Sequence, residues 1–136
     1  MTSETEGMLR TFEVPESEMS VVIEDDGRVA YAYLRRDGEI VADVWLYNVA
    51  ATPDENTWTD RAQMPFLNPR RYCTQEAFRR MTADTPVTCT QILEDVELRV
   101  EGQLLARLRP GIKPGWSRFA RIRGPLAKPL DQLVTE

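Results

Sequence analysis

Short runs in which apolar and polar residues alternate dominate the sequence between positions 19 and 122, and Asp-Gly or Glu-Gly turns separate several of them. An alternation of period two places successive side chains on opposite faces of an extended strand. Turns of this composition favour antiparallel hairpins. The pattern therefore predicts an all-β, mainly antiparallel fold of about seven strands, arranged as a two-sheet β-sandwich or as an open barrel.

The residues from 19 to 49 predict a three-stranded meander with turns at Asp25-Asp26-Gly27 and Asp37-Gly38. We expect a three-residue first loop, because it pairs Ile23 with Val29 and so groups apolar side chains on one face. The second loop is expected to have two residues. The predicted core face then consists of Val21, Ile23, Val29, Tyr31, Tyr33, Ile40, Ala42, Val44 and Leu46.

The opposite face of this meander is more apolar than a solvated face needs to be, since it carries Trp45 and Tyr47 beside Asp43. Either the middle segment of the same chain covers these aromatic residues, or a second subunit docks on them. The second alternative makes Trp45 and Tyr47 a subunit interface. The protein is then a homodimer with a structural role and no small-molecule ligand.

A second hairpin is predicted over residues 96–108, with a turn at Glu101-Gly102-Gln103. Strand patterns also precede and follow it, at 87–93 and 116–122. The outward positions of the hairpin bring acidic residues opposite arginines, Glu97 with Arg107 and Asp95 with Arg109. This arrangement predicts one buried face and one solvated, ion-paired face.

The length of the chain and its punctuation predict one domain over residues 18–136, preceded by an acidic, loosely ordered tail over residues 1–17. Residues 50–86 contain four prolines and form a long crossover that caps the sheet. We expect one or two short helices in this crossover, one of them capped by Thr74. Residues 124–136 are expected to form a C-terminal tail packed on the sheet.

Histidine is absent from the chain, and there are two cysteines. Without an imidazole, Ser-His-Asp and Cys-His catalytic arrangements, HExxH zinc sites and the facial iron triad are excluded. Cys73 and Cys89 alone cannot complete a tetrahedral zinc site. The sequence also lacks the glycine-rich motifs that cradle phosphates. We therefore expect neither a metal ion nor a cofactor.

Charge is distributed unevenly, because residues 1–60 carry 14 acidic and 4 basic residues whereas residues 61–136 carry 8 acidic and 13 basic ones. The net charge of −5 repels phosphate backbones, so nucleic-acid binding is not expected. The sequence starts without a secretory signal and has no apolar run long enough to span a bilayer. We expect a cytoplasmic protein that does not bind membranes and keeps its thiols reduced.

The segment from Arg109 to Arg118 contains two Pro-Gly pairs four positions apart, and each pair predicts a tight turn with glycine at positive φ. Such a stiff loop would hold Arg109, Lys113 and Arg118 beside the indole of Trp116. Cationic groups beside an aromatic ring suit an anion, a sugar or an acidic partner. The leading interpretation is a non-catalytic binding domain whose partner protein or small ligand contacts Arg109, Lys113, Trp116 and Arg118.

A second interpretation is a small carboxylate-dependent hydrolase or isomerase with Asp43 or Glu24 as its base. Burial among apolar neighbours would raise the pKa of Asp43 towards the range in which a carboxylate accepts a proton. Cys73 is a weaker catalytic candidate: it follows two arginines and precedes the expected helix, and both features lower the pKa of a thiol.

Overall fold

The computed structural model describes residues 7–55, 62, 64–74 and 81–132. These residues form one sheet of four strands and one of five, and the sheets are not closed into a barrel. The all-β, mainly antiparallel prediction is confirmed, and of its two arrangements the structure adopts two separate sheets. The described residues contain nine strands instead of the seven or so that the sequence indicates.

The first sheet has the order β1 (Met8–Glu13), β2 (Met19–Asp25), β3 (Val29–Arg36) and β4 (Glu39–Asn48). The second has the order β5 (Val87–Ile92), β6 (Asp95–Val100), β7 (Gln103–Arg109), β8 (Ile112–Ser117) and β9 (Lys128–Pro129). Neighbouring strands are antiparallel except β8 and β9, which are parallel. Two helical segments have bounds within the described residues, the short 3-10 turns η2 (Arg70–Tyr72) and η3 (Leu130–Gln132). No helix in the described ranges is long and apolar enough to cross a membrane.

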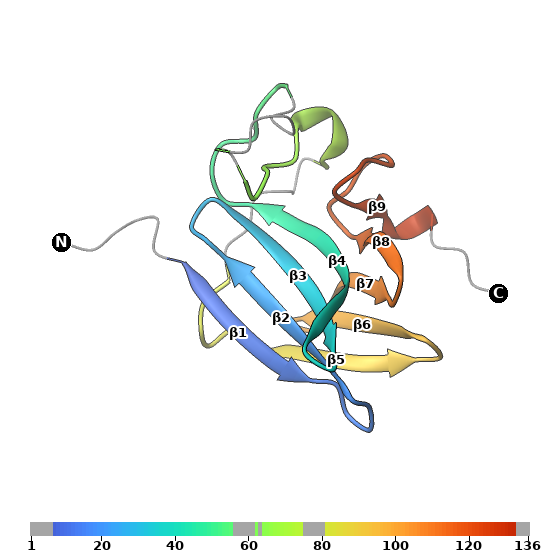
Figure 1. Ribbon diagram of the computed structural model, residues 1–136. Coiled ribbons are helices and arrows are strands. Elements are labelled where there is room, and N and C mark those ends of the chain that lie inside the picture. Colours follow the sequence, from blue (N-terminus) through green and yellow to red (C-terminus); the bar gives the residue numbers. More distant parts are fainter. Residues whose placement is uncertain (1–6, 56–61, 63, 75–80, 133–136) are drawn as a thin grey trace.

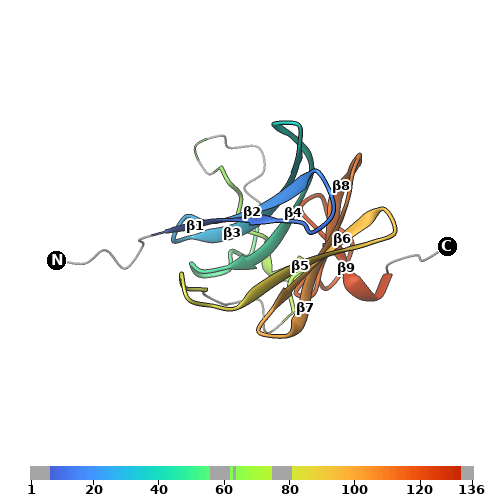
Figure 2. The same ribbon diagram turned by 90° about the horizontal axis from the view of Figure 1, so that it is seen from below.

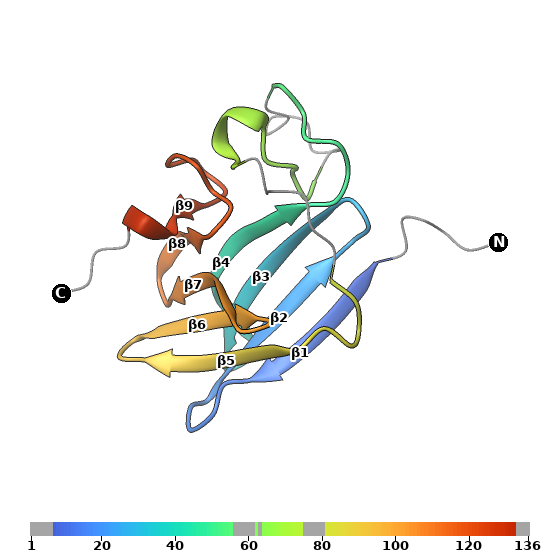
Figure 3. The same cartoon turned by 180° about the vertical axis from the view of Figure 1, so that it is seen from behind.

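The strands of the second sheet run across those of the first (Figures 1 and 3), and Figure 2 shows the two sheets as separate layers. The inward side chains of both sheets form one buried cluster between them. Burying an aliphatic side chain contributes roughly 1.5–3 kcal/mol, so this cluster is the main source of stability. Its largest members with almost no exposed surface include Ile23, Leu34, Trp45, Leu46, Tyr47, Leu98, Leu105 and Leu108.

The register of the first hairpin differs from the prediction, because Ile23 pairs with Ala32 and not with Val29. Asp26 closes the turn with its own side chain: its Oδ1 accepts hydrogen bonds from the backbone N–H of Arg28 at 2.8 Å and of Val29 at 2.9 Å. Aspartate often shapes turns in this way. As a consequence, the side chains of β3 point to the faces opposite to those predicted. Ala30, Ala32 and Leu34 lie on the inward face with Val21 and Ile23, whereas Tyr31 and Tyr33 lie on the outer face.

The second hairpin turns at Asp37-Gly38 as predicted, with φ angles of 55° and 80° that are typical of a type I′ turn. Two register shifts along β3 and β4 then move the pairing, so that Tyr33 lies opposite Asp43 and Tyr31 opposite Trp45. Because of these shifts, the predicted core face is correct for Ala42 and Val44 but not for the tyrosines or for Ile40, which is exposed.

The end of β4 is enclosed by the same chain. Trp45 and Tyr47 are both 0% exposed, so neither offers surface to a second subunit. The side chain of Asn48 organises this region. Its Oδ1 accepts from Trp45 Nε1 at 2.9 Å and from the N–H of Asn68 at 3.1 Å, and its Nδ2 donates to the carbonyl oxygen of Asn68 at 3.0 Å. One buried amide thus attaches the crossover to the sheet.

Residues 8–13, which the sequence assigns to a loose tail, form β1 in continuous register with β2. Arg10 on this strand donates from Nη1 to the carbonyl oxygens of Thr82 at 3.2 Å and Thr85 at 2.6 Å. The domain therefore begins well before residue 18. The helix predicted after Thr74 falls on residues 75–80, which lie outside the described residues.

The hairpin of β6 and β7 pairs Glu97 with Arg107 and Leu98 with Ala106, as predicted. A register shift beyond Leu98 places Arg99 opposite Leu104, so the turn is tighter than the expected three residues. The strand predicted at 116–122 instead spans Ile112–Ser117 and is followed by a turn.

The two Pro-Gly pairs have different structures. Gly111 has a φ of 84° in the turn between β7 and β8, as expected. Gly115 lies inside β8, where a Cβ would come within 2.6 Å of the backbone oxygen of Arg107 and 3.4 Å of the Cβ of Val44. The second glycine therefore permits close packing of β8 on its neighbours and does not form a turn.

The C-terminal segment joins the second sheet through β9, which pairs with the end of β8. The carbonyl oxygen of Leu126 also accepts from the N–H of Trp45 at 3.0 Å. This segment therefore contacts both sheets, and it brings Lys128 beside Trp116.

Candidate functional site

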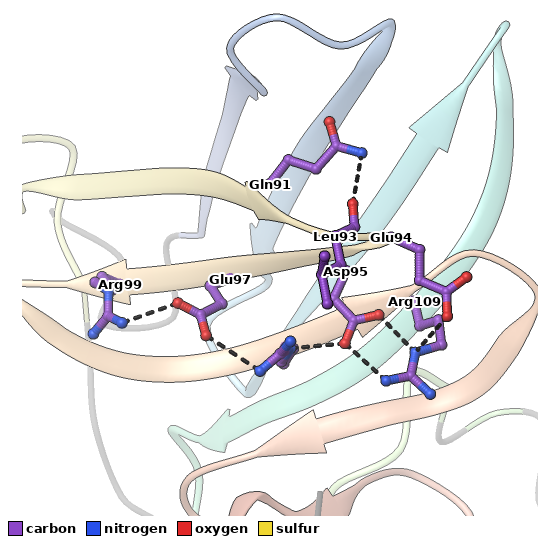
Figure 4. A network of polar contacts seen from close by, with 8 residues as sticks. Gln91, Leu93, Glu94, Asp95, Glu97, Arg99 and Arg109 are labelled. Atoms are coloured by element: carbon purple, nitrogen blue, oxygen red, sulfur yellow. Dashed lines mark hydrogen bonds and ion pairs between the residues drawn. The ribbon is translucent and has the colours of Figure 1, made fainter. Parts of the chain in front are cut away.

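An ionic network covers the outer face of the hairpin formed by β6 and β7 (Figure 4). Asp95 accepts a hydrogen bond from Arg107 Nε at 2.7 Å and two from Arg109, from Nε at 2.6 Å and Nη2 at 2.9 Å. Glu97 extends the network by accepting from Arg99 at 2.9 Å and from Arg107 at 3.4 Å. The predicted ion-paired face is therefore present, but Asp95 and Arg107 are buried in it and not solvated.

The two arginines determine the charge of Asp95. Burial alone would raise the pKa of this carboxyl, but the hydrogen bonds and charges of Arg109 and Arg107 outweigh burial and hold the pKa below its usual range. A carboxylate bound in this way stays ionised. The network therefore uses Asp95 to neutralise positive charge that would otherwise be buried without a partner.

Trp116 lies beside this network with two cations against its ring. The guanidinium carbon of Arg109 is 5.0 Å from the ring centroid, and Nζ of Lys128 is 4.3 Å from it. Both distances are typical of cation–π contacts. The indole is itself buried, so it holds cations in place and does not offer an open face on which a sugar ring can stack.

Of the two cations on the Trp116 ring, Lys128 is the one without an opposite charge beside it in the described part of the chain. The residue is only 7% exposed, and among the described residues no carboxylate lies within ion-pair distance of it. Burial, followed by the positive charges of Arg123 and Arg109, lowers the pKa of its ammonium group. An incoming anion would relieve this repulsion. We call Arg109, Trp116, Arg123 and Lys128 the cationic cluster.

The structure separates the four residues that the sequence assigns to one binding loop. Arg109 and Trp116 are together. Lys113 instead lies with Nζ 3.9 Å from Oδ2 of Asp43, on the first sheet. Arg118 donates from Nε to the carbonyl oxygen of Leu104 at 2.6 Å and lines a different depression. Lys128 takes their place beside Trp116, and it was missed because only the pairing of β9 with β8 brings it there.

Asp43 lies on the outer face of the first sheet, opposite Tyr33. Burial raises the pKa of its carboxyl, as the enzyme interpretation requires, but Lys113 acts in the opposite direction and stabilises the ionised form. Burial, followed by the charges of Glu24 and Asp43, raises the pKa of Tyr33 to about 12, so its hydroxyl stays protonated. Asp43 is thus a partly exposed member of an ion pair.

Cys73 does not have the features of a nucleophile. Burial raises the pKa of its thiol to about 12, although Arg121 and Arg70 act to lower it. The expectation that nearby arginines activate this thiol is therefore wrong, because desolvation is the stronger effect. Its Sγ lies 3.3 Å from the carbonyl oxygen of Asn68, to which it donates. Burial also raises the pKa of Cys89 to about 12, and the two cysteines are not joined.

Within the described ranges, no group of three or more Cys, Asp or Glu side chains is arranged to hold a metal ion. The sequence matches no protein family model, and neither a curated protein nor a solved structure shows significant similarity to the chain.

Proposed function

We propose that this protein is a non-catalytic binding domain whose second sheet binds an anionic group, either a small anion or the carboxylates of an acidic partner, at the cationic cluster. The observation that carries the proposal is Lys128, a residue that is only 7% exposed and whose ammonium group lies on the Trp116 ring and is repelled by Arg123 and Arg109. Bringing a charge out of water is costly unless an opposite charge compensates it. The Trp116 ring supplies part of that compensation, and a bound anion supplies the rest.

The charge of the second sheet supports this choice of ligand. Residues 87–132 contain eight basic and five acidic residues, whereas residues 7–48 contain four basic and nine acidic ones. The uneven charge along the sequence is therefore divided between the two sheets. An anion approaching the second sheet meets a positive region of a protein whose net charge is −5.

Arg109 shows how the cluster can take part in binding without losing its structural role. Its Nε and Nη2 are bonded to Asp95, and Nη1 makes no hydrogen bond to the described residues. Asp95 therefore fixes the guanidinium while one N–H-bearing nitrogen is left for a ligand. A preorganised donor of this kind loses little conformational entropy when it binds.

The test uses inorganic phosphate and a hexaglutamate peptide as probes, followed by the NMR shift of the Trp116 indole N–H and by calorimetry. We expect wild type to bind at least one probe, with an affinity that falls as salt is added. Lys128→Met keeps most of the side-chain volume but removes the charge, and we expect it to weaken binding tenfold or more.

The matched control is Lys113→Gln, which removes a lysine that lies on Asp43 and outside the cationic cluster. It should bind both probes as wild type does. The proposal is overturned if wild type binds neither probe, or if Lys128→Met binds them as tightly as Lys113→Gln.

A further inference from the structure

A shallow groove of about 490 Å³ runs over the outer face of the first sheet, whereas Arg109, Trp116 and Lys128 of the cationic cluster belong to the second sheet. Two of its apolar side chains are strongly exposed, Leu9 at 69% and Ile40 at 49%. The groove is lined by Leu9, Val22, Glu24, Tyr33, Arg35, Gly38 and Ile40. Contiguous exposed apolar groups on a sheet are typical of an interaction surface.

The side chains of this groove form three rows across the strands. Val22 and Tyr33 are paired in the middle row. Leu9 is paired with Glu24 in the row on one side, and Arg35 with Ile40 in the row on the other. Among the residues that line the groove, each outer row therefore combines one apolar residue with one charged residue, Glu24 in one row and Arg35 in the other. Glu13 lies in the same row as Arg35, on β1, but it does not line the groove.

Glu24 and Arg35 do not neutralise each other. Glu24 is four residues from Ser20, the partner of Arg35, and four residues of strand span about 13 Å. Both side chains are exposed, and within the residues that the structure describes neither forms an ion pair or a hydrogen bond. The groove thus has an apolar centre between an unpaired acid and an unpaired base.

We propose that this groove is the interface of a homodimer, in which a second copy of the chain packs its first sheet face to face on the first. A two-fold axis that lies between the two sheets and runs across the strands at Val22 and Tyr33 places the row of Glu24 in each copy on the row of Arg35 in its partner. The interface then contains two symmetry-related contacts between Glu24 of one copy and the partner's Arg35. Leu9 of each copy approaches the row of the partner's Arg35 and Ile40. Two-fold interfaces require such a self-complementary surface.

The arrangement favours a second copy over a partner of uniform charge, which would leave either Glu24 or Arg35 opposite a like charge. Other residues of the same chain contact one end of this outer face and so limit the area that a partner can cover. Beyond the groove, the hydroxyl of Tyr31 donates to the carbonyl oxygen of Phe66 at 2.7 Å, and Arg28 donates to that of Pro65 at 3.0 Å. Pro65 and Phe66 therefore lie at the Tyr31 end of the row that contains Leu9 and Glu24, whereas Leu9, Glu24, Arg35 and Ile40 stay exposed.

The first experiment is sedimentation equilibrium of the full chain from 1 μM to about 1 mM, the concentration range over which modest interfaces dissociate. We expect a monomer–dimer equilibrium and at least a tenfold weaker association for Ile40→Glu. Leu93→Glu is the matched control, because Leu93 is 83% exposed on the hairpin between β5 and β6 and lies outside the groove. A wild type that is monomeric throughout, or an Ile40→Glu variant that dimerises like Leu93→Glu, overturns the proposal.

The second experiment exchanges the charges. Glu24→Arg and Arg35→Glu each create two like-charge contacts in their own homodimer, so each variant alone should associate at least tenfold more weakly than wild type. Mixed together, the two variants restore two opposite-charge contacts in a heterodimer, so association should recover. If the mixture associates no better than the separate variants, the charge pairing is wrong. Phosphate or peptide binding at the cationic cluster is independent of both results.

Discussion

The outer faces of the two sheets differ in how their charged side chains are paired. On the second sheet, Asp95 is bonded to both Arg107 and Arg109, and the network is largely buried. On the first sheet, Glu24 and Arg35 are exposed on either side of an apolar pair and, in the described part of the chain, have no charged partner. Both faces nevertheless arise from strands with the same alternation of apolar and polar residues.

The strand register explains this difference. Glu97 lies directly opposite Arg107, and side chains in such positions are about 4.5–5.5 Å apart at Cβ. Glu24 and Arg35 are two rows apart, about 13 Å along the strands, which no ion pair spans. The same composition therefore closes one face into a stabilising network and leaves the other available to a partner.

The largest expected effect comes from breaking the closed face. Asp95→Asn removes the charge that compensates Arg107 and Arg109, and loss of one partner of a buried ion pair costs about 3–5 kcal/mol. Urea denaturation measures this loss. Glu94→Gln is the control. The Glu94 side chain is exposed, and its Oε2 forms only a long ion pair with Arg109 Nε, at 3.8 Å, so this substitution should change stability by less than about 1 kcal/mol. Equal losses in the two variants would show that the network is not the stabilising feature.

A close approach between β8 and its neighbour β7 gives the next effect. Gly115→Ala forces a Cβ against the backbone oxygen of Arg107, and overpacking of this kind costs about 1–3 kcal/mol. Gly111→Ala meets no neighbouring atom within 4 Å, and its cost arises only from the positive φ, about 1 kcal/mol. Thermal denaturation of both variants separates the two causes. A smaller loss for Gly115→Ala than for Gly111→Ala would contradict the close approach of β8 to the backbone of β7.

The two faces should also respond to pH with opposite signs. The pKa of Asp95 is held below that of the unfolded chain, so its ionised form stabilises the fold above pH 4, and this contribution is lost as the pH falls through the folded pKa. The pKa of Asp43 is raised, so its protonated form stabilises the fold at low pH, and that contribution is lost as the pH rises through the folded pKa. NMR titration of the carboxyl carbons should find Asp43 titrating above Asp95; the reverse order would refute the comparison.

The smallest effects belong to the open face. Glu24→Gln and Arg35→Gln remove exposed charges that have no partner among the described residues, so each should change the stability of the monomer by less than about 0.5 kcal/mol. Denaturation is measured at the lowest usable concentration, because dimer formation would add to the apparent stability. A loss above 1 kcal/mol in dilute solution would mean that these side chains are part of the monomer's own network.

The sequence predicts the second sheet better than the first, for a physical reason. In the hairpin of β6 and β7, the apolar pairs and the charge pairs require the same register, and the structure has that register from Val96 to Leu98. In the hairpin of β2 and β3, side-chain pairing favoured one register while the Asp26 carboxylate fixed another through backbone hydrogen bonds. Local hydrogen bonding of a turn residue was the stronger determinant.

The candidate site was only partly predictable. Arg109 and Trp116 lie on adjacent strands, β7 and β8, and a short-range pattern found both. Lys128 follows a turn and joins the sheet through a parallel pairing of two residues, for which the sequence has no periodic signal. The buried amide of Asn48 was equally invisible, because its partners at Asn68 come from a loop without a repeating pattern.

The attachment of the C-terminal segment to β4 has a consequence for shortened forms of the protein. Gly111 donates its N–H to the carbonyl oxygen of Val41 at 2.8 Å, and Trp45 donates to that of Leu126 at 3.0 Å, so the outer edge of β4 is satisfied by residues late in the chain. A truncation before Leu126 would keep the Gly111 contact but leave the N–H of Trp45 without its partner, and it would remove β9 from the edge of β8. Bare strand edges template pairing between molecules, so such a fragment should aggregate.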